Sequence, residues 1–116
     1  MIEVIKTPGN HIAYATTDKS VIFGDEDLSI NLKNRQKDEA VTIDVCEDIN
    51  GELTMGTAAG QRYVAQVEIP ARAYTETEEK NPAYVEGGTE SEYVVKREPM
   101  PFDINACTIY LWGLEA

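Results

Sequence analysis

The sequence predicts an all-β protein, an antiparallel β-sandwich or small barrel of about eight short strands with little or no helix. Three observations predict this class. β-Branched residues dominate the apolar runs, and turn-forming residues separate these runs at short, fairly regular intervals. In addition, apolar residues do not recur at helical spacing for longer than a turn or so.

One expected strand, within the stretch 61–74 (QRYVAQVEIPARAY), organises the rest of the chain. Its residues alternate between two faces, as in a strand with one buried side. Pro70 ends the strand because proline brings no N–H to the ladder. Its expected neighbour is 107–114 (CTIYLWGL), which is apolar on both faces and therefore central or part of a subunit interface. The expected buried face is Tyr63, Ala65, Val67 and Ile69, and the other face is Val64, Gln66 and Glu68.

The N-terminal part predicts short strands separated by turns. Residues 2–5 form a possible edge strand before the turn Thr7-Pro8-Gly9-Asn10. Residues 11–17 alternate weakly, and residues 21–23 form a short apolar strand that ends at Gly24.

Two clearly alternating stretches follow, at 28–33 and 40–47. Because a wholly polar segment joins them, they predict an antiparallel hairpin. The pair Asn50-Gly51 then predicts a type I′ turn, which leads into a short returning strand at 52–55.

Residues 75–92 (TETEEKNPAYVEGGTESE) are acidic, and only Tyr84 and Val85 are large apolar residues. Two interpretations stay open: a solvent-exposed, partly disordered loop, or a binding arm anchored by these two residues. Residues 93–97 (YVVKR) are expected to return as a strand, and 98–103 to form an extended linker, since each proline restricts the residue before it.

Length and charge limit the possible functions. With 116 residues, the chain is expected to be a single domain, 1–116, that carries this long loop or arm. A net charge of −11 argues against direct binding to nucleic acid or to an anionic membrane, and favours a solvated surface, a basic protein partner or a cation. We see no signal peptide or membrane-spanning run, so a cytoplasmic protein is expected. Cys46 and Cys107 are expected to be reduced and partly buried.

We find no pattern that predicts catalysis. The single histidine, His11, lies near no recognisable nucleophile motif, and the chain has no G-x-S-x-G, Walker or dinucleotide-binding pattern. Calcium is the most credible metal, at the acidic turns 25–27 and 44–50, but neither turn has the spacing of an EF-hand loop. We therefore expect no enzyme activity, no catalytic residue, no cofactor and no metal site.

The C-terminal half carries V-E-I-P-A-R-A-Y, a variable acidic stretch, and then R-E-P-M-P-F-D-I-N-A-C-T-I-Y-L-W. Over residues 66–112 this pattern resembles small uncharacterised proteins encoded in bacteriophages and prophages. The resemblance implies a phage context, in which small all-β proteins often serve as capsid, connector or tail components. It identifies no functional residue.

Two functions from different classes remain. The first is a non-enzymatic phage-type structural protein that forms a homo-oligomer through protein–protein contacts, in the bacterial host cytoplasm or in the virion. Its expected partner-binding residues are Tyr84, Val85 and Trp112. The alternative is an acidic inhibitor that imitates nucleic acid and occupies the basic groove of a host protein; its affinity would fall steeply with salt.

Overall fold

The structure, a computed structural model, describes residues 1–57, 60 and 62–114. This part of the chain is mostly β, with ten strands and two short 3₁₀ turns, η1 (Lys33–Arg35) and η2 (Ile104–Ala106). The all-β prediction is thus confirmed. The strands are β1 (Ile2–Ile5), β2 (Tyr14–Thr16), β3 (Ser20–Phe23), β4 (Leu28–Asn31), β5 (Val41–Glu47), β6 (Leu53–Met55), β7 (Arg62–Ile69), β8 (Tyr74–Lys80), β9 (Tyr93–Pro99) and β10 (Thr108–Leu111).

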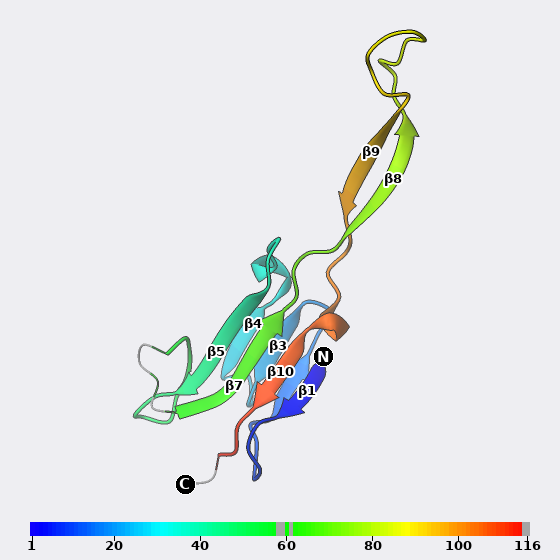
Figure 1. Ribbon diagram of the computed structural model, residues 1–116. Coiled ribbons are helices and arrows are strands. Elements are labelled where there is room, and N and C mark those ends of the chain that lie inside the picture. Colours follow the sequence, from blue (N-terminus) through cyan, green and yellow to red (C-terminus); the bar gives the residue numbers. More distant parts are fainter. Residues whose placement is uncertain (58–59, 61, 115–116) are drawn as a thin grey trace.

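The strands form three sheets (Figure 1). The largest has the order β1-β10-β7-β5-β6, and its pairs are antiparallel except for β1, which runs parallel to β10. A second sheet has the order β2-β3-β4, and β8 and β9 form a separate two-stranded sheet. The closed barrel, one of the two expected architectures, is not formed, because the largest sheet is open and ends at β1 and β6.

The two larger sheets share one hydrophobic core. Side chains from β3 and β4 pack in the same cluster as side chains from β5, β7 and β10. Burying these side chains provides the main driving force for folding. The fully or almost fully buried members are Val21, Phe23, Ile30, Leu32, Ile43, Val45, Val64, Ala65, Val67, Ile69, Cys107, Ile109 and Leu111.

The expected pairing of the organising strand is confirmed. β7 pairs antiparallel with β10, with Val67 opposite Ile109, and β10 lies centrally between β7 and β1. The expected faces are wrong at one end, because the register shifts between Val45 and Cys46 and leaves Val64 as an extra residue. Val64 is therefore buried, and Tyr63 turns to the outer face with 40% of its surface exposed.

The expected hairpin between 28–33 and 40–47 is wrong. β4 pairs with β3, whereas β5 pairs with β6 and β7, so the two stretches belong to different sheets. The segment that contains η1 carries the chain from one sheet to the other. An alternating sequence shows only that a strand buries one face, and does not identify its neighbour. Here the buried residues of both strands belong to the same core cluster.

The turn between β5 and β6 has a different geometry from the expected type I′ turn. Gly51 has a positive φ of 79°, but Asn50 does not, and a type I′ turn requires positive φ at both central residues. The N–H of Gly51 donates to the carbonyl of Asp48 at 3.0 Å. The Asp48 carboxylate accepts from the backbone N–H groups of Asn50 and Glu52, at 2.8 and 2.9 Å. This side chain stabilises the turn in place of a second left-handed residue.

The two-stranded sheet makes the molecule long. β8 and β9 project beyond the two larger sheets (Figure 1), and the principal extents are 74 × 24 × 23 Å. The radius of gyration is 20.8 Å, whereas a compact chain of this length would have about 13 Å. No described helix is long and apolar enough to cross a membrane.

Candidate interaction surface

The projecting hairpin, residues 74–99, is called the arm below. Its strands pair over seven residues each, from Tyr74 opposite Pro99 to Lys80 opposite Tyr93. All residues of β9, and all of β8 except Tyr74, are exposed. An isolated two-stranded hairpin is marginally stable in water, because it cannot bury a hydrophobic face. The arm therefore depends on its attachment to the rest of the protein or on a partner.

The root of the arm is attached to the segment that precedes β5. Arg72 donates to the backbone carbonyl of Gln36 at 3.0 Å and forms an ion pair with Asp38 at 3.3 Å. The Tyr74 hydroxyl donates to the same Asp38 carboxylate. Two backbone bonds add to these contacts, from Arg72 N–H to the Lys37 carbonyl and from the Met100 N–H to the Ala73 carbonyl, both 2.8 Å. These contacts give the arm a defined direction.

The arm has two chemically different faces, because alternate residues of a strand point to opposite sides. The ion-pair face comprises Thr75, Thr77, Glu79, Val94, Lys96 and Glu98. The aromatic face comprises Tyr74, Glu76, Glu78, Lys80, Tyr93, Val95, Arg97 and Pro99.

The charged side chains of the ion-pair face pair with one another. Lys96 Nζ lies 3.2 Å from a Glu98 carboxylate oxygen and 3.5 Å from one of Glu79. The hydrogen bond to Glu98, followed by the charge of Glu79, raises the pKa of Lys96 above its ordinary value. These exposed pairs add little to stability, since water screens them. They nevertheless leave this face without an unpaired base.

The charged side chains of the aromatic face form fewer ion pairs than those of the ion-pair face. The Arg97 guanidinium lies over the Tyr74 ring, 3.8 Å from its centroid. Tyr93 and Val95 on this face are 55% and 62% exposed; with Val94, whose side chain points to the ion-pair face, they form an exposed run of three large apolar residues along β9. Such a run is unusual on a surface without a binding function. The aromatic face is therefore the best candidate for a contact surface in the described part of the chain.

Two of the three residues expected to bind a partner lie at the tip of the arm. Asn81 closes the tip: its N–H donates to the Glu92 carbonyl at 2.8 Å, and its side chain bonds the backbone of Ala83 and Ser91. Tyr84 is half-buried in this turn, and Val85 is 66% exposed. The tip thus presents Val85 rather than Tyr84 to solvent.

The third expected residue, Trp112, lies elsewhere. It follows β10 on the body of the protein, and its ring stacks on Tyr63 with the centroids 5.2 Å apart and the planes 29° apart. The backbone N–H of Trp112 donates to the Val64 carbonyl at 3.2 Å. The structure therefore does not bring Trp112 together with the two tip residues. Sequence reasoning also missed Tyr93 and Val95 as binding candidates, although YVVKR was expected to be a strand and its apolar residues could have been noted.

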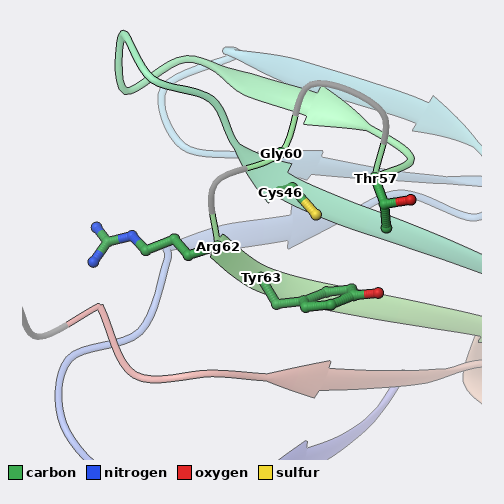
Figure 2. Close-up of a pocket in the computed structure, with 5 residues that line it drawn as sticks. All are labelled: Cys46, Thr57, Gly60, Arg62 and Tyr63. Carbon is green, nitrogen blue, oxygen red and sulfur yellow. The ribbon is translucent and has the colours of Figure 1, made fainter.

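A small pocket lies beside Tyr63, lined by Cys46, Thr57, Gly60 and Arg62 (Figure 2). Arg62 extends away from the other four residues (Figure 2). Its guanidinium forms an ion pair with Glu47 at 3.0 Å and donates a hydrogen bond to the Leu114 carbonyl at 3.0 Å. The pocket volume is about 100 Å³, well below the roughly 300 Å³ at which small-molecule sites begin. Burial, followed by the charge of Asp44, raises the pKa of the Cys46 thiol, which makes this sulfur a poor nucleophile.

The residues considered for catalysis and metal binding have ordinary structural partners. His11 Nε2 lies 2.7 Å from the Thr7 carbonyl. The carboxylate of Asp48, part of the candidate calcium turn, accepts two backbone N–H groups in its own turn. Cys46 and Cys107 are free and buried. Among the described residues, no three His, Cys, Asp or Glu side chains are grouped so that they could hold a metal ion.

Comparison of the chain with protein-family models, with curated proteins and with solved structures found no match.

Proposed function

We propose that this chain is a non-enzymatic structural protein that assembles with other protein subunits, and that the arm is its contact element. One observation carries the proposal: the exposed run Tyr93-Val94-Val95 lies on a hairpin that has no core of its own. A neighbouring surface over the aromatic face would bury Tyr93 and Val95, and an added third strand would stabilise the hairpin. Both gains come from binding and need no catalytic group.

The composition of the arm supports a protein partner. The arm exposes Tyr93 and Arg97, residue types that are enriched in protein–protein interfaces. Its root contacts keep it in one direction, so less conformational freedom is lost on binding. Val85 is a further exposed apolar residue, at the tip of the arm.

The wider setting of the proposal is a phage or prophage protein, such as a capsid, connector or tail component, found in the host cytoplasm or in the virion. The resemblance of residues 66–112 supports this setting. Within the proposal, the body is a β-sandwich of the five-stranded and three-stranded sheets, which serves as a platform for the arm.

Solution mass tests the proposal. We would measure the full chain by multi-angle light scattering at low and at high salt, alone and with the variant Tyr93→Ser/Val95→Ser. The wild-type chain should form an oligomer, and the variant should reduce its mass. Ile49→Ser is the matched control, because Ile49 is 81% exposed but lies in the turn between β5 and β6.

Two results would contradict the proposal: a wild-type chain that stays monomeric at high concentration, or an oligomer that the arm variant leaves intact while Trp112→Asp dissociates it. A monomer that binds a basic host protein, with an affinity that collapses at high salt, would instead support the acidic-inhibitor alternative.

A further inference from the structure

The arm carries a more specific inference, which rests on the proposed function. We infer that the partner is a second copy of this chain and that arms pair head to tail. In this arrangement, the free edge of β9 in one copy pairs with the free edge of β8 in the next.

Both edges of the arm are open. Among the described strands, β8 pairs only with β9, and β9 only with β8, so each has one edge whose backbone N–H and C=O groups have no described strand partner. Open edges are templates for a further strand. β9 has the residues that such a template favours, because Tyr93, Val94 and Val95 all have high β propensity. Each arm in a head-to-tail series gains a neighbouring strand on both edges.

The charges of the two strands favour unlike pairing. β8 carries Glu76, Glu78 and Glu79 against a single Lys80, whereas β9 carries Lys96 and Arg97 against a single Glu98. On the aromatic face of a single copy, Glu76, Glu78 and Arg97 form no ion pair with the described residues, although Glu76 lies opposite Arg97 in the register. On the aromatic face, β8 therefore has acids without an ion-pair partner, and β9 has a base whose described contact is the Tyr74 ring rather than a carboxylate.

Pairing between like strands is less favourable. Two antiparallel β8 strands centred on Thr77 would place Glu76 of each copy opposite Glu78 of the other, and like charges directly opposite are destabilising. Two β9 strands would gather Lys96 and Arg97 of both copies at one seam. A β9 strand against a β8 strand in the register of the hairpin itself instead places Arg97 opposite Glu76 of the neighbour and Val95 opposite its Glu78.

Head-to-tail pairing determines the kind of assembly. Each copy uses one edge to receive a neighbour and the other edge to join the next, so the contact is heterologous and leads to a ring or to a filament. In either case the arms form one continuous sheet, and Tyr93, Val95 and Tyr74 of successive copies line the same face.

A charge-reversal experiment tests the inference on the full chain. One variant, Glu76→Arg/Glu78→Lys, makes both strands basic, and the other, Lys96→Glu/Arg97→Glu, makes both strands acidic. Each variant alone should dissociate at a concentration about ten-fold or more above that of the wild type, since the directly opposed charges at position 97 of one copy and position 76 of the next change from attractive to repulsive. An equimolar mixture should recover the wild-type mass, because the basic β9 of the first variant can pair with the acidic β8 of the second, and the reverse.

Cysteine cross-linking reports the register independently. Thr77 and Lys96 lie opposite each other in the hairpin, so the inferred register brings Thr77 of one copy opposite Lys96 of the next. Directly opposed residues of paired strands are about 5 Å apart, within the range of a disulfide. With Thr77→Cys in one chain and Lys96→Cys in another, mixing under mild oxidation should give a mixed dimer. The matched control, Ile49→Cys mixed with Lys96→Cys, should not cross-link.

The outcomes separate this inference from the proposed function. If the basic variant alone keeps the wild-type mass, or if the mixture does not reassemble, head-to-tail pairing is overturned. If the charge variants keep the oligomer but Tyr93→Ser/Val95→Ser disrupts it, the arm binds another surface, and the assembly function stands without this inference. If no variant changes the mass, or the wild-type chain is a monomer, both are rejected.

Discussion

Arg97 covers the ring of Tyr74 at the point where the arm leaves the body, with Cζ 3.8 Å from the ring centroid. The hydroxyl of the same tyrosine donates to Asp38. One side chain thus connects β9 to the segment before β5, through its ring on one side and its oxygen on the other. The orientation of the arm depends on this residue more than on any single contact within the hairpin.

The first prediction concerns Tyr74. Tyr74→Leu removes both the ring and the hydroxyl, and should increase amide hydrogen exchange throughout β8 and β9 while the five-stranded sheet stays protected. Tyr74→Phe keeps the ring and should have a smaller effect, since a cation–π contact at an exposed site contributes about 0.5–1 kcal/mol. Mass spectrometry of exchanged peptides would measure both. Equal exchange in the two variants would show that the ring contact does not hold the arm.

A second prediction contrasts the core with the arm. Ile109 is fully buried in the core that the two larger sheets share, so Ile109→Ala should lower the free energy of unfolding by about 2–5 kcal/mol. Val95→Ala removes an exposed side chain and should change this free energy by no more than about 0.5 kcal/mol. Urea unfolding followed by tryptophan fluorescence would compare them at a concentration where both chains are monomeric. A large loss in Val95→Ala under those conditions would mean that the arm packs on its own body.

The sequence was most informative where hydrophobicity alone determines position. β10 is apolar on both faces, and this predicted its central place beside β7. The sequence was less informative about which strands pair with each other. β4 and β5 both alternate, but alternation gives the buried face and not the neighbour, so their expected pairing was wrong. The bulge at Val64 could not be predicted from the sequence either. Tyr63 and Val64 both have large hydrophobic side chains, so either could have occupied the buried position.

The arm could be predicted only in part. β8 has the sequence YTETEEK, in which glutamates and a lysine give a low β propensity, and no alternation of apolar residues marks a strand. The pairing of β8 with β9, the contact of Tyr74 with Asp38 and that of Arg72 with Gln36 all involve residues that are separated in the chain. Tyr84 and Val85 were expected as anchors because they are the large apolar residues of the acidic stretch. The exposed apolar run lies just beyond that stretch, in β9.

A third prediction concerns Gly60, which packs against Cys46 beside the small pocket (Figure 2). A Cβ atom at Gly60 would lie 2.6 Å from Cys46 Cβ and 3.0 Å from its Sγ. Gly60→Ala should therefore destabilise the protein by about 1–3 kcal/mol through overpacking. Cys46→Gly removes both atoms, so Gly60→Ala should cost less in that background. Additive free energies in this double-mutant cycle would show that the two residues do not contact each other.

The last prediction concerns stability at alkaline pH. The Tyr14 hydroxyl donates to a Glu3 carboxylate oxygen at 2.9 Å. Burial, followed by this hydrogen bond and by the charge of Glu3, raises the pKa of Tyr14 from 10.0 to about 12. The folded protein therefore retains this proton more tightly than the unfolded chain does. The resulting stabilisation is fully present below pH 10 and is lost as the pH rises from 10 to about 12.

Tyr14→Phe removes this titration and leaves the ring in place. Between pH 10 and about pH 12, the stability of the wild-type chain should fall more steeply than that of the variant. Burial also raises the pKa values of Cys46, Tyr63 and Cys107, but these groups are present in both chains, so the difference between the two slopes isolates Tyr14. Urea midpoints measured across this range would give the slopes. Parallel curves would mean that Tyr14 ionises as readily in the folded protein as in the unfolded chain, and that its bond to Glu3 does not stabilise the fold.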